Sequence, residues 1–151
     1  MSIVKAHRFP VAVEWRGDRV ACASVRGKQP LEVATSPEFR GTHPELWSPE
    51  DLLVAALASC YAVTLVSLAE WRGIPLRGLS VDGLGHVERR EDGRFAFVAI
   101  DLQVKVETDE ATLAAAEEAA RETKEACLVS IALDAPVHLE LEISARTGAA
   151  A

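Results

Sequence analysis

Apolar and polar residues alternate in short runs along the first 35 residues of the chain. This period of two predicts β-strands over 11–15, 19–25 and 31–34. The runs are separated by turn residues, among them Gly17 and Pro30, so we predict an antiparallel meander.

Alternation returns in the second half of the chain. Two long runs, 79–90 and 94–107, are joined by a segment that contains Asp92-Gly93, which is a strong hairpin signal between alternating strands. A last alternating run, 137–143, predicts a final strand.

A long apolar run lies between these two groups of strands. Residues 52–69 carry no charge, and Ser48, Pro49 and Asp51 precede them as an N-cap, a first helical residue and a capping carboxylate. A glycine at position 73 predicts the end of the helix. The helix is apolar on nearly all faces, so we expect it to be enclosed on every side. Two small sheets offer too little cover for that, which favours burial by a second subunit.

The same run approaches the length of a membrane span. Ser59, Thr64 and Ser67 interrupt it and no basic cluster flanks it, so we favour a buried central helix. A second helix is predicted over 109–124, with an acidic start and a basic end, and a short helical turn over 127–133. Strands, helix, strands, helix and strand form the order of an α+β fold, and 151 residues suit one domain over 1–151.

Charge and composition exclude several classes of partner. The net charge is −7 and the basic residues are scattered, so we expect no nucleic-acid partner. Because we interpret the apolar run as a buried helix, we also expect no membrane partner. Three cysteines without a charged and then apolar leader favour the reducing cytoplasm. No CxxC or HxxxH spacing is present and the histidines are dispersed, so we expect no metal and no cofactor.

Two cysteines lie in unlike surroundings, Cys60 within the apolar helix and Cys127 after the acidic one. This contrast indicates thiol chemistry, although inert packing is the alternative for any single buried thiol. Cys60 lies 12 residues after Ser48, beyond the reach of the helix dipole, so a thiolate there would need a nearby cation. We interpret the third cysteine, Cys22, as strand packing.

An arginine suits this role because it stays charged when desolvated. Arg40 lies in the loop before the helix, but spacing alone does not select it over Arg16 or Arg19. Glu50 lies about 15 Å from Cys60 along the helix axis, so an intervening arginine or a partner chain would have to connect them.

The segments around both cysteines follow a known pattern. Ser-Pro-Glu-Asp-Leu-Leu (48–53) followed by Ala-Ala-Leu-Ala-Ser-Cys (55–60) resembles the Asn-Pro-Glu-Glu-Leu and Ala-Ala-Cys-Phe segments of the OsmC/Ohr proteins, the osmotically inducible and organic hydroperoxide resistance family. Cys-Leu-Val-Ser-Ile-Ala-Leu (127–133) is similar to the second-cysteine segment of that family, with Leu128 in place of a proline. The pair Phe39-Arg40, spaced ahead of Glu50, matches the OsmC branch, whereas the Ohr branch has its arginine where Arg16 stands.

The resemblance implies a swapped α+β homodimer of the OsmC-like fold, with antiparallel sheets around the central helix and two sites at the interface. It implies a thiol peroxidase in which Cys60 attacks a hydroperoxide and Cys127 resolves the sulfenic acid as a disulfide. Arg40 would stabilise the thiolate and the departing alkoxide, and Glu50 would hold Arg40. A dithiol reductant of lipoyl or thioredoxin type would restore the thiols.

Two alternatives stay open from the sequence. Leu57, Tyr61 and Trp47 would either line an apolar pocket for organic peroxides or belong to the core and interface. A redox-sensing or ligand-binding dimer without turnover is the rival to an enzyme, because no feature of the sequence separates the two.

Overall fold

The computed structural model describes residues 5–146. The chain forms two compact units, an N-terminal unit that extends to Leu52 and a C-terminal unit that begins at Leu53. The expectation of one domain over the whole chain stays a prediction.

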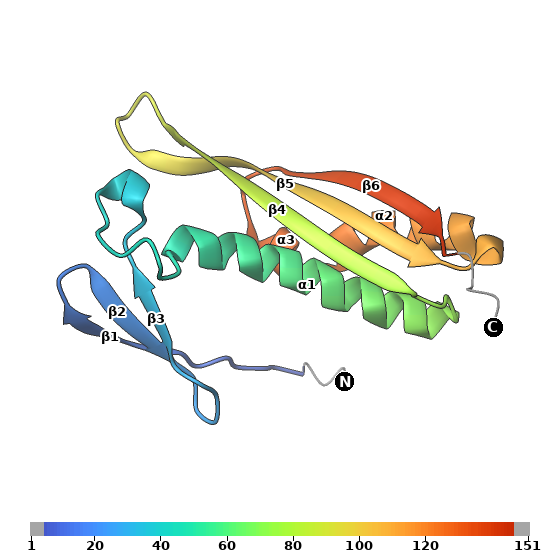
Figure 1. Cartoon of the computed structure of the whole chain (residues 1–151), viewed down its shortest axis with the longest axis horizontal. Helices are drawn as coiled ribbons and strands as arrows, with labels where there is room; N and C mark the ends of the chain where they lie inside the picture. Colours follow the sequence, from blue (N-terminus) through green and yellow to red (C-terminus); the bar gives the residue numbers. More distant parts are fainter. Residues whose placement is uncertain (1–4, 147–151) are drawn as a thin grey trace. The chain divides into compact units, whose positions relative to one another are not determined.

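The N-terminal unit contains the predicted meander. Strands β1 (Ala12–Gly17), β2 (Val20–Ser24) and β3 (Leu31–Ala34) form an antiparallel sheet in this order (Figure 1). The β1–β2 turn forms because Gly17 and Asp18 both adopt positive φ, as tight hairpin turns require.

Helix α1 (Pro49–Arg72) has the predicted bounds. Its start is a reciprocal capping box, in which the Ser48 N–H donates to Asp51 Oδ2 (2.9 Å) and the Asp51 N–H donates to Ser48 Oγ (3.1 Å). The helix ends at Gly73, whose φ of 66° is readily accessible only to glycine.

The C-terminal unit has a three-stranded sheet. Strands β4 (Gly78–Arg89) and β5 (Phe95–Thr108) form the predicted hairpin. The expectation of purely antiparallel sheets is wrong here, because β6 (Val137–Ala145) pairs parallel to β5. The reason is the connection between them, which contains the short turn η2 (Glu110–Thr112) and two helices, α2 (Leu113–Ala126) and α3 (Leu128–Ala132). A helical crossover returns the chain to the end where β5 began, so the next strand runs parallel.

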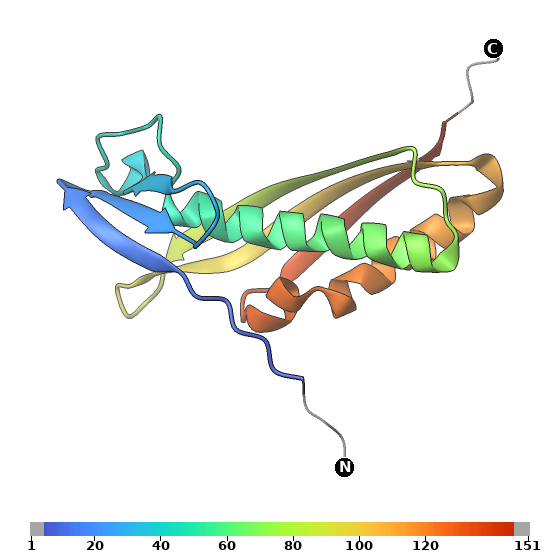
Figure 2. The ribbon, with the colours of Figure 1, turned by 90° about the horizontal axis from the view of Figure 1, so that it is seen from below.

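Helices α1 and α2 cover one face of this sheet (Figure 2). Alternate residues of β5 point into the core between sheet and helices, namely Ile100, Leu102, Val104 and Val106. Helix α1 contributes one stripe at every fourth position, namely Leu57, Tyr61, Leu65 and Ala69. The Tyr61 hydroxyl donates to the Ala120 carbonyl and so fixes α1 against α2.

Helix α1 is not enclosed on every side within one chain, and its complete enclosure was expected only with a second subunit. Val63 is 63% exposed and Trp71 is 81% exposed, because one sheet and α2 cover only the face that carries the buried stripe. Within residues 5–146, α1 is the one helix whose length and composition would suffice to cross a membrane. Its stripe of core residues favours the interpretation as a core helix, and burial by a second subunit stays a prediction.

Candidate active site

The structure brings Cys60 and Cys127 together, although they are 67 positions apart in sequence. Cys127 is fully buried, and Cys60 packs against the core cluster to which Cys127 belongs. Each of the two thiols shifts the pKa of the other, and both cysteines are free. Two thiols in direct contact are the arrangement from which a disulfide forms.

The backbone around Cys127 brings donors to both sulfur atoms. Cys127 follows α2 with extended backbone angles (φ −74°, ψ 113°), and α3 begins at the next residue. The first N–H groups of a helix have no acceptor within it. Those of Leu128 and Val129 lower the pKa of Cys60, and those of Ser130 and Val129 lower the pKa of Cys127.

These contacts lower the pKa of Cys60. Partial burial raises it, but hydrogen bonds from the Val129 N–H, the Cys127 thiol, the Thr64 hydroxyl and the Leu128 N–H together outweigh burial. The pKa of Cys60 therefore lies below that of an ordinary cysteine, which favours its thiolate.

The pKa of Cys127 moves in the opposite direction. Burial raises it most, the neighbouring Cys60 raises it further, and the N–H groups of Ser130 and Val129 offset only part of the rise. Cys127 therefore keeps its proton where Cys60 loses it, so the two thiols are chemically unequal.

Sequence reasoning missed Thr64 as a member of this site. It appeared only as one of the polar interruptions of the apolar run, yet it lies four residues after Cys60 and therefore on the same helix face. A hydroxyl at this spacing from a cysteine, inside an otherwise apolar helix, was the signal available.

Arg40 and Glu50 belong to the N-terminal unit, whereas the cysteines belong to the C-terminal unit. Over residues 5–146 no hydrogen bond or ion pair joins Arg40 to Glu50, so the structure does not bring these two together. One carboxylate oxygen of Glu50, Oε2, is buried without a hydrogen-bond partner in the same range.

The loop that carries Arg40 is tightly closed. Arg40 adopts a φ of 66°, and the Arg19 guanidinium donates to the carbonyls of Phe39 (3.1 Å) and Arg40 (3.0 Å). The Gly41 N–H donates to the Ser36 carbonyl, and a Cβ at Gly41 would overlap the Thr35 carbonyl oxygen. The Arg19 side chain therefore stabilises this loop.

Arg16 is also engaged within the N-terminal sheet. Its guanidinium lies 3.2 Å from the Glu14 carboxylate. The pKa of Arg16 is raised, most by the Cys22 side chain and next by Glu14. Cys22, expected as strand packing, thus also influences the charge of a neighbouring arginine.

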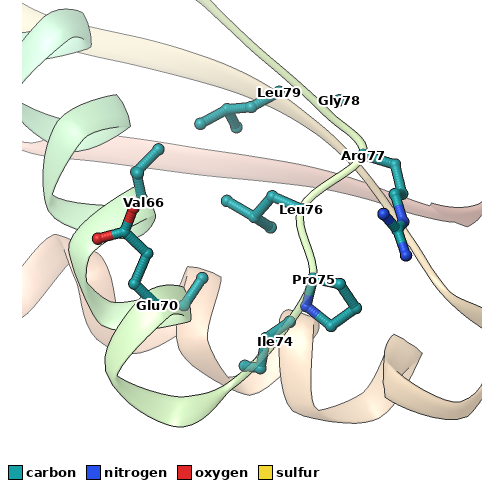
Figure 3. A pocket seen from close by; sticks show the side chains of 9 residues that line it. Val66, Glu70, Ile74, Pro75, Leu76, Arg77, Gly78 and Leu79 are labelled. Carbon is teal, nitrogen blue, oxygen red and sulfur yellow. The ribbon is translucent and has the colours of Figure 1, made fainter.

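The proposed apolar pocket residues divide between the two units. Leu57 and Tyr61 are core residues, and Trp47 is 49% exposed. A pocket of about 500 Å³ lies near the C-terminal end of α1, where Val66, Ala69 and Glu70 face residues 74–79 (Figure 3). Neither Cys60 nor Cys127 lines this pocket.

A polar cluster on the outer face of the C-terminal sheet also escaped sequence reasoning. Asp101 on β5 bonds His86 Nε2 on β4 (2.6 Å) and His138 Nδ1 on β6 (2.9 Å). These three residues are dispersed along the chain, and only strand pairing brings them together. No cluster able to hold a metal ion occurs within residues 5–146.

Comparison with known proteins places the chain in a family. Residues 42–142 match the family model described as OsmC-like protein. The uncharacterized protein YmaD of Bacillus subtilis is 24% identical over 146 residues, which cover 94% of this chain and 97% of YmaD.

Similar solved structures agree with this match. An OsmC-like protein of unknown function from Vibrio cholerae has a TM-score of 0.82 at 17% identity, over 91% of this chain and all of that one. An organic hydroperoxide resistance protein from Elizabethkingia anophelis has a TM-score of 0.76 at 17% identity, over 95% of this chain and all of that one. These likenesses confirm the α+β OsmC-like fold. The resemblance inferred from the cysteine segments is confirmed as well, and the chain belongs to the OsmC-like protein family.

Proposed function

We propose that this protein is a cysteine-based thiol peroxidase that reduces organic hydroperoxides. The observation that carries the proposal is the pair of unequal thiols, Cys60 with a lowered pKa in contact with Cys127, whose pKa is raised. A nucleophile must be a thiolate, whereas a resolving thiol need not be one until the first step is complete.

The proposed reaction has two steps at these sulfur atoms. The Cys60 thiolate attacks the terminal oxygen of the hydroperoxide, the O–O bond breaks, and the alkoxide leaves and takes a proton. This leaves a sulfenic acid on Cys60, which condenses with the Cys127 thiol to form a disulfide and release water. A dithiol reductant then reduces the disulfide by exchange and is itself oxidised.

Arg40 is our candidate for the cation that assists this chemistry, supplied across the interface of a homodimer, and Glu50 is our candidate to orient it. Two of the three candidate arginines already have partners. Arg16 forms an ion pair with Glu14 and has its pKa raised by Cys22, and Arg19 donates hydrogen bonds to backbone carbonyls. In the part of the chain that the structure describes, Arg40 has no such side-chain partner. The unpartnered buried oxygen of Glu50 supports its role, because a buried carboxylate is costly without a cation.

A homodimer is part of the proposal because α1 leaves large apolar side chains exposed. A permanent dimer would bury more than about 2,000 Å² in total. Sedimentation tests this directly, and a stable monomer at micromolar concentration would remove the interface from the proposal.

Stopped-flow consumption of cumene hydroperoxide with a dithiol reductant tests the activity. We expect the parent to turn over repeatedly, Cys60→Ser to be inactive, and Cys127→Ser to complete about one turnover with a trappable sulfenic acid on Cys60. Cys22→Ser is the matched control and should retain turnover. A parent that is oxidised by peroxide but does not turn over with any dithiol would favour the redox-sensing alternative instead.

A further inference from the structure

The pocket near the C-terminal end of α1 has a largely apolar wall (Figure 3). One side comes from the last turns of α1, and the other comes from the segment that leads into β4. The apolar residues that line it are Val66, Ala69, Ile74, Pro75, Leu76 and Leu79. Its volume of about 500 Å³ lies within the range of about 300–1,000 Å³ that is typical of small-molecule sites. The pocket therefore suits a small ligand with an apolar body.

Two charged residues line the same pocket, Glu70 and Arg77. The Arg77 guanidinium is already bound, because it donates to both carboxylate oxygens of Asp109 (2.9 and 3.1 Å), and its side chain points away from the apolar wall (Figure 3). The Glu70 carboxylate has no hydrogen bond or ion pair within residues 5–146. Of the two charges at the pocket, the negative one is therefore free to meet a ligand.

The position of Glu70 in its helix also favours a cation. Glu70 lies in the last turn of α1, where the helix dipole places partial negative charge, so a carboxylate is disfavoured there and a cation is stabilised. The basic residue of that turn, Arg72, forms an ion pair with Glu122 of α2 instead. The carboxylate and the helix end therefore act together on this side of the pocket, and both attract positive charge.

We propose that this pocket binds a small organic cation, namely an apolar chain or ring that carries one ammonium group. The apolar body lies against Val66, Leu76 and Leu79, and the ammonium group pairs with the Glu70 carboxylate. Each methylene that the ligand buries should tighten binding about fourfold, whereas a partly exposed ion pair should add about fivefold at most. The apolar wall therefore supplies most of the affinity, and Glu70 supplies the selectivity for a positive charge.

Titration of the full chain with hexylamine tests the proposal, followed by calorimetry and by amide chemical shifts in NMR. At neutral pH hexylamine is an ammonium ion, and hexan-1-ol and hexanoate are its neutral and anionic counterparts of equal chain length. We expect hexylamine to bind saturably and to shift the amides of residues 66–70 and 74–79. Hexan-1-ol should bind about two- to fivefold more weakly, and hexanoate more weakly still. Butylamine should bind more weakly than hexylamine by about fourfold for each missing methylene.

Variants at Glu70 separate the charge from the apolar wall. Glu70→Gln should weaken hexylamine binding by about two- to fivefold and leave hexan-1-ol binding unchanged, because the shape of the pocket is kept. Glu70→Lys should reverse the preference, so that hexanoate binds more tightly than hexylamine. Glu118→Gln is the matched control, because Glu118 is an exposed carboxylate of α2 that does not line the pocket, and it should bind all three probes as the parent does.

Three results would overturn the proposal. The first is equal affinity for the three probes, and the second is an equal loss of hexylamine binding in Glu70→Gln and Glu118→Gln. The third is the absence of saturable binding at millimolar hexylamine, which is the result expected if a partner subunit covers the pocket. The inference does not rest on the proposed peroxidase activity, since neither Cys60 nor Cys127 lines the pocket. A parent that binds hexylamine but does not reduce cumene hydroperoxide would therefore contradict the proposed function alone.

Discussion

Replacing Gly83 by alanine should force α1 and β4 apart at one identifiable contact. A Cβ built at Gly83 would lie 2.6 Å from Cγ1 of Val54, whereas ordinary contact begins at 3.4 Å. The difference, 3.4 minus 2.6, requires a movement of at least 0.8 Å. The next neighbours, Leu102 and Ala58, lie at ordinary distances of 3.6 and 3.8 Å, so Val54 is the sole obstruction.

The magnitude follows from the cost of overpacking. Extra methyl groups in a packed core cost about 1–3 kcal/mol. For a chain of this length each kcal/mol lowers the melting temperature by about 2–4 °C. Gly83→Ala should therefore lower it by roughly 2–12 °C.

Equilibrium unfolding in urea at one fixed protomer concentration measures this cost, since dimerisation would make stability depend on concentration. Val54→Ala alone should cost no more than about 1.6 kcal/mol, or about 0.8 for each of two methylene equivalents. The double variant should be more stable than the sum of the two single changes by about 1–3 kcal/mol, because the obstructing methyl group is gone. Gly78→Ala is the control, because a Cβ there meets only the flexible Glu107 carboxylate. Single changes that add to within about 0.5 kcal/mol would refute the contact.

Three further predictions concern charge and catalysis. Thr64→Val should raise the pKa of Cys60 and slow its alkylation at neutral pH, because the hydroxyl helps lower that pKa; an unchanged alkylation profile would exclude the contact. Hydrogen bonds from His86 and His138 lower the pKa of Asp101, so the charged carboxylate stabilises the fold above the ordinary pKa of an aspartate, and this stabilisation is lost as pH falls through the lowered pKa. Asp101→Asn should remove it. The urea midpoints of parent and variant, measured from pH 2 to 7, should therefore converge at the acid end, and parallel curves would contradict this. Arg40→Ala should slow Cys60 alkylation and Arg16→Ala should not, and the reverse result would move the active-site arginine to the Ohr arrangement.

Local patterns predicted most of the elements of this fold. The capping box at Ser48, the glycine stop at Gly73 and the Asp92-Gly93 hairpin act through residues within a few positions of one another, so their effect can be read from the chain. The parallel pairing of β6 could not be read in this way, because it depends on the path of the crossover between β5 and β6. The sequence predicted that one chain could not cover all of α1, but not which face would be covered, since an apolar run does not distinguish its faces.

The same distinction between local pattern and tertiary structure applies to the candidate site. By itself the sequence indicated thiol chemistry, through two cysteines in unlike surroundings that are embedded in segments resembling one family. Only the tertiary structure decided that Cys60 lies beside Cys127 and the start of α3, whereas Thr64, four residues after Cys60 in the same helix, could have been found from the spacing. The physical reason is that a thiol acquires its pKa from the groups that touch it. Those groups come from α1 and α3, more than 60 positions apart, and only the packing of the two helices in one core brings them to the same sulfur.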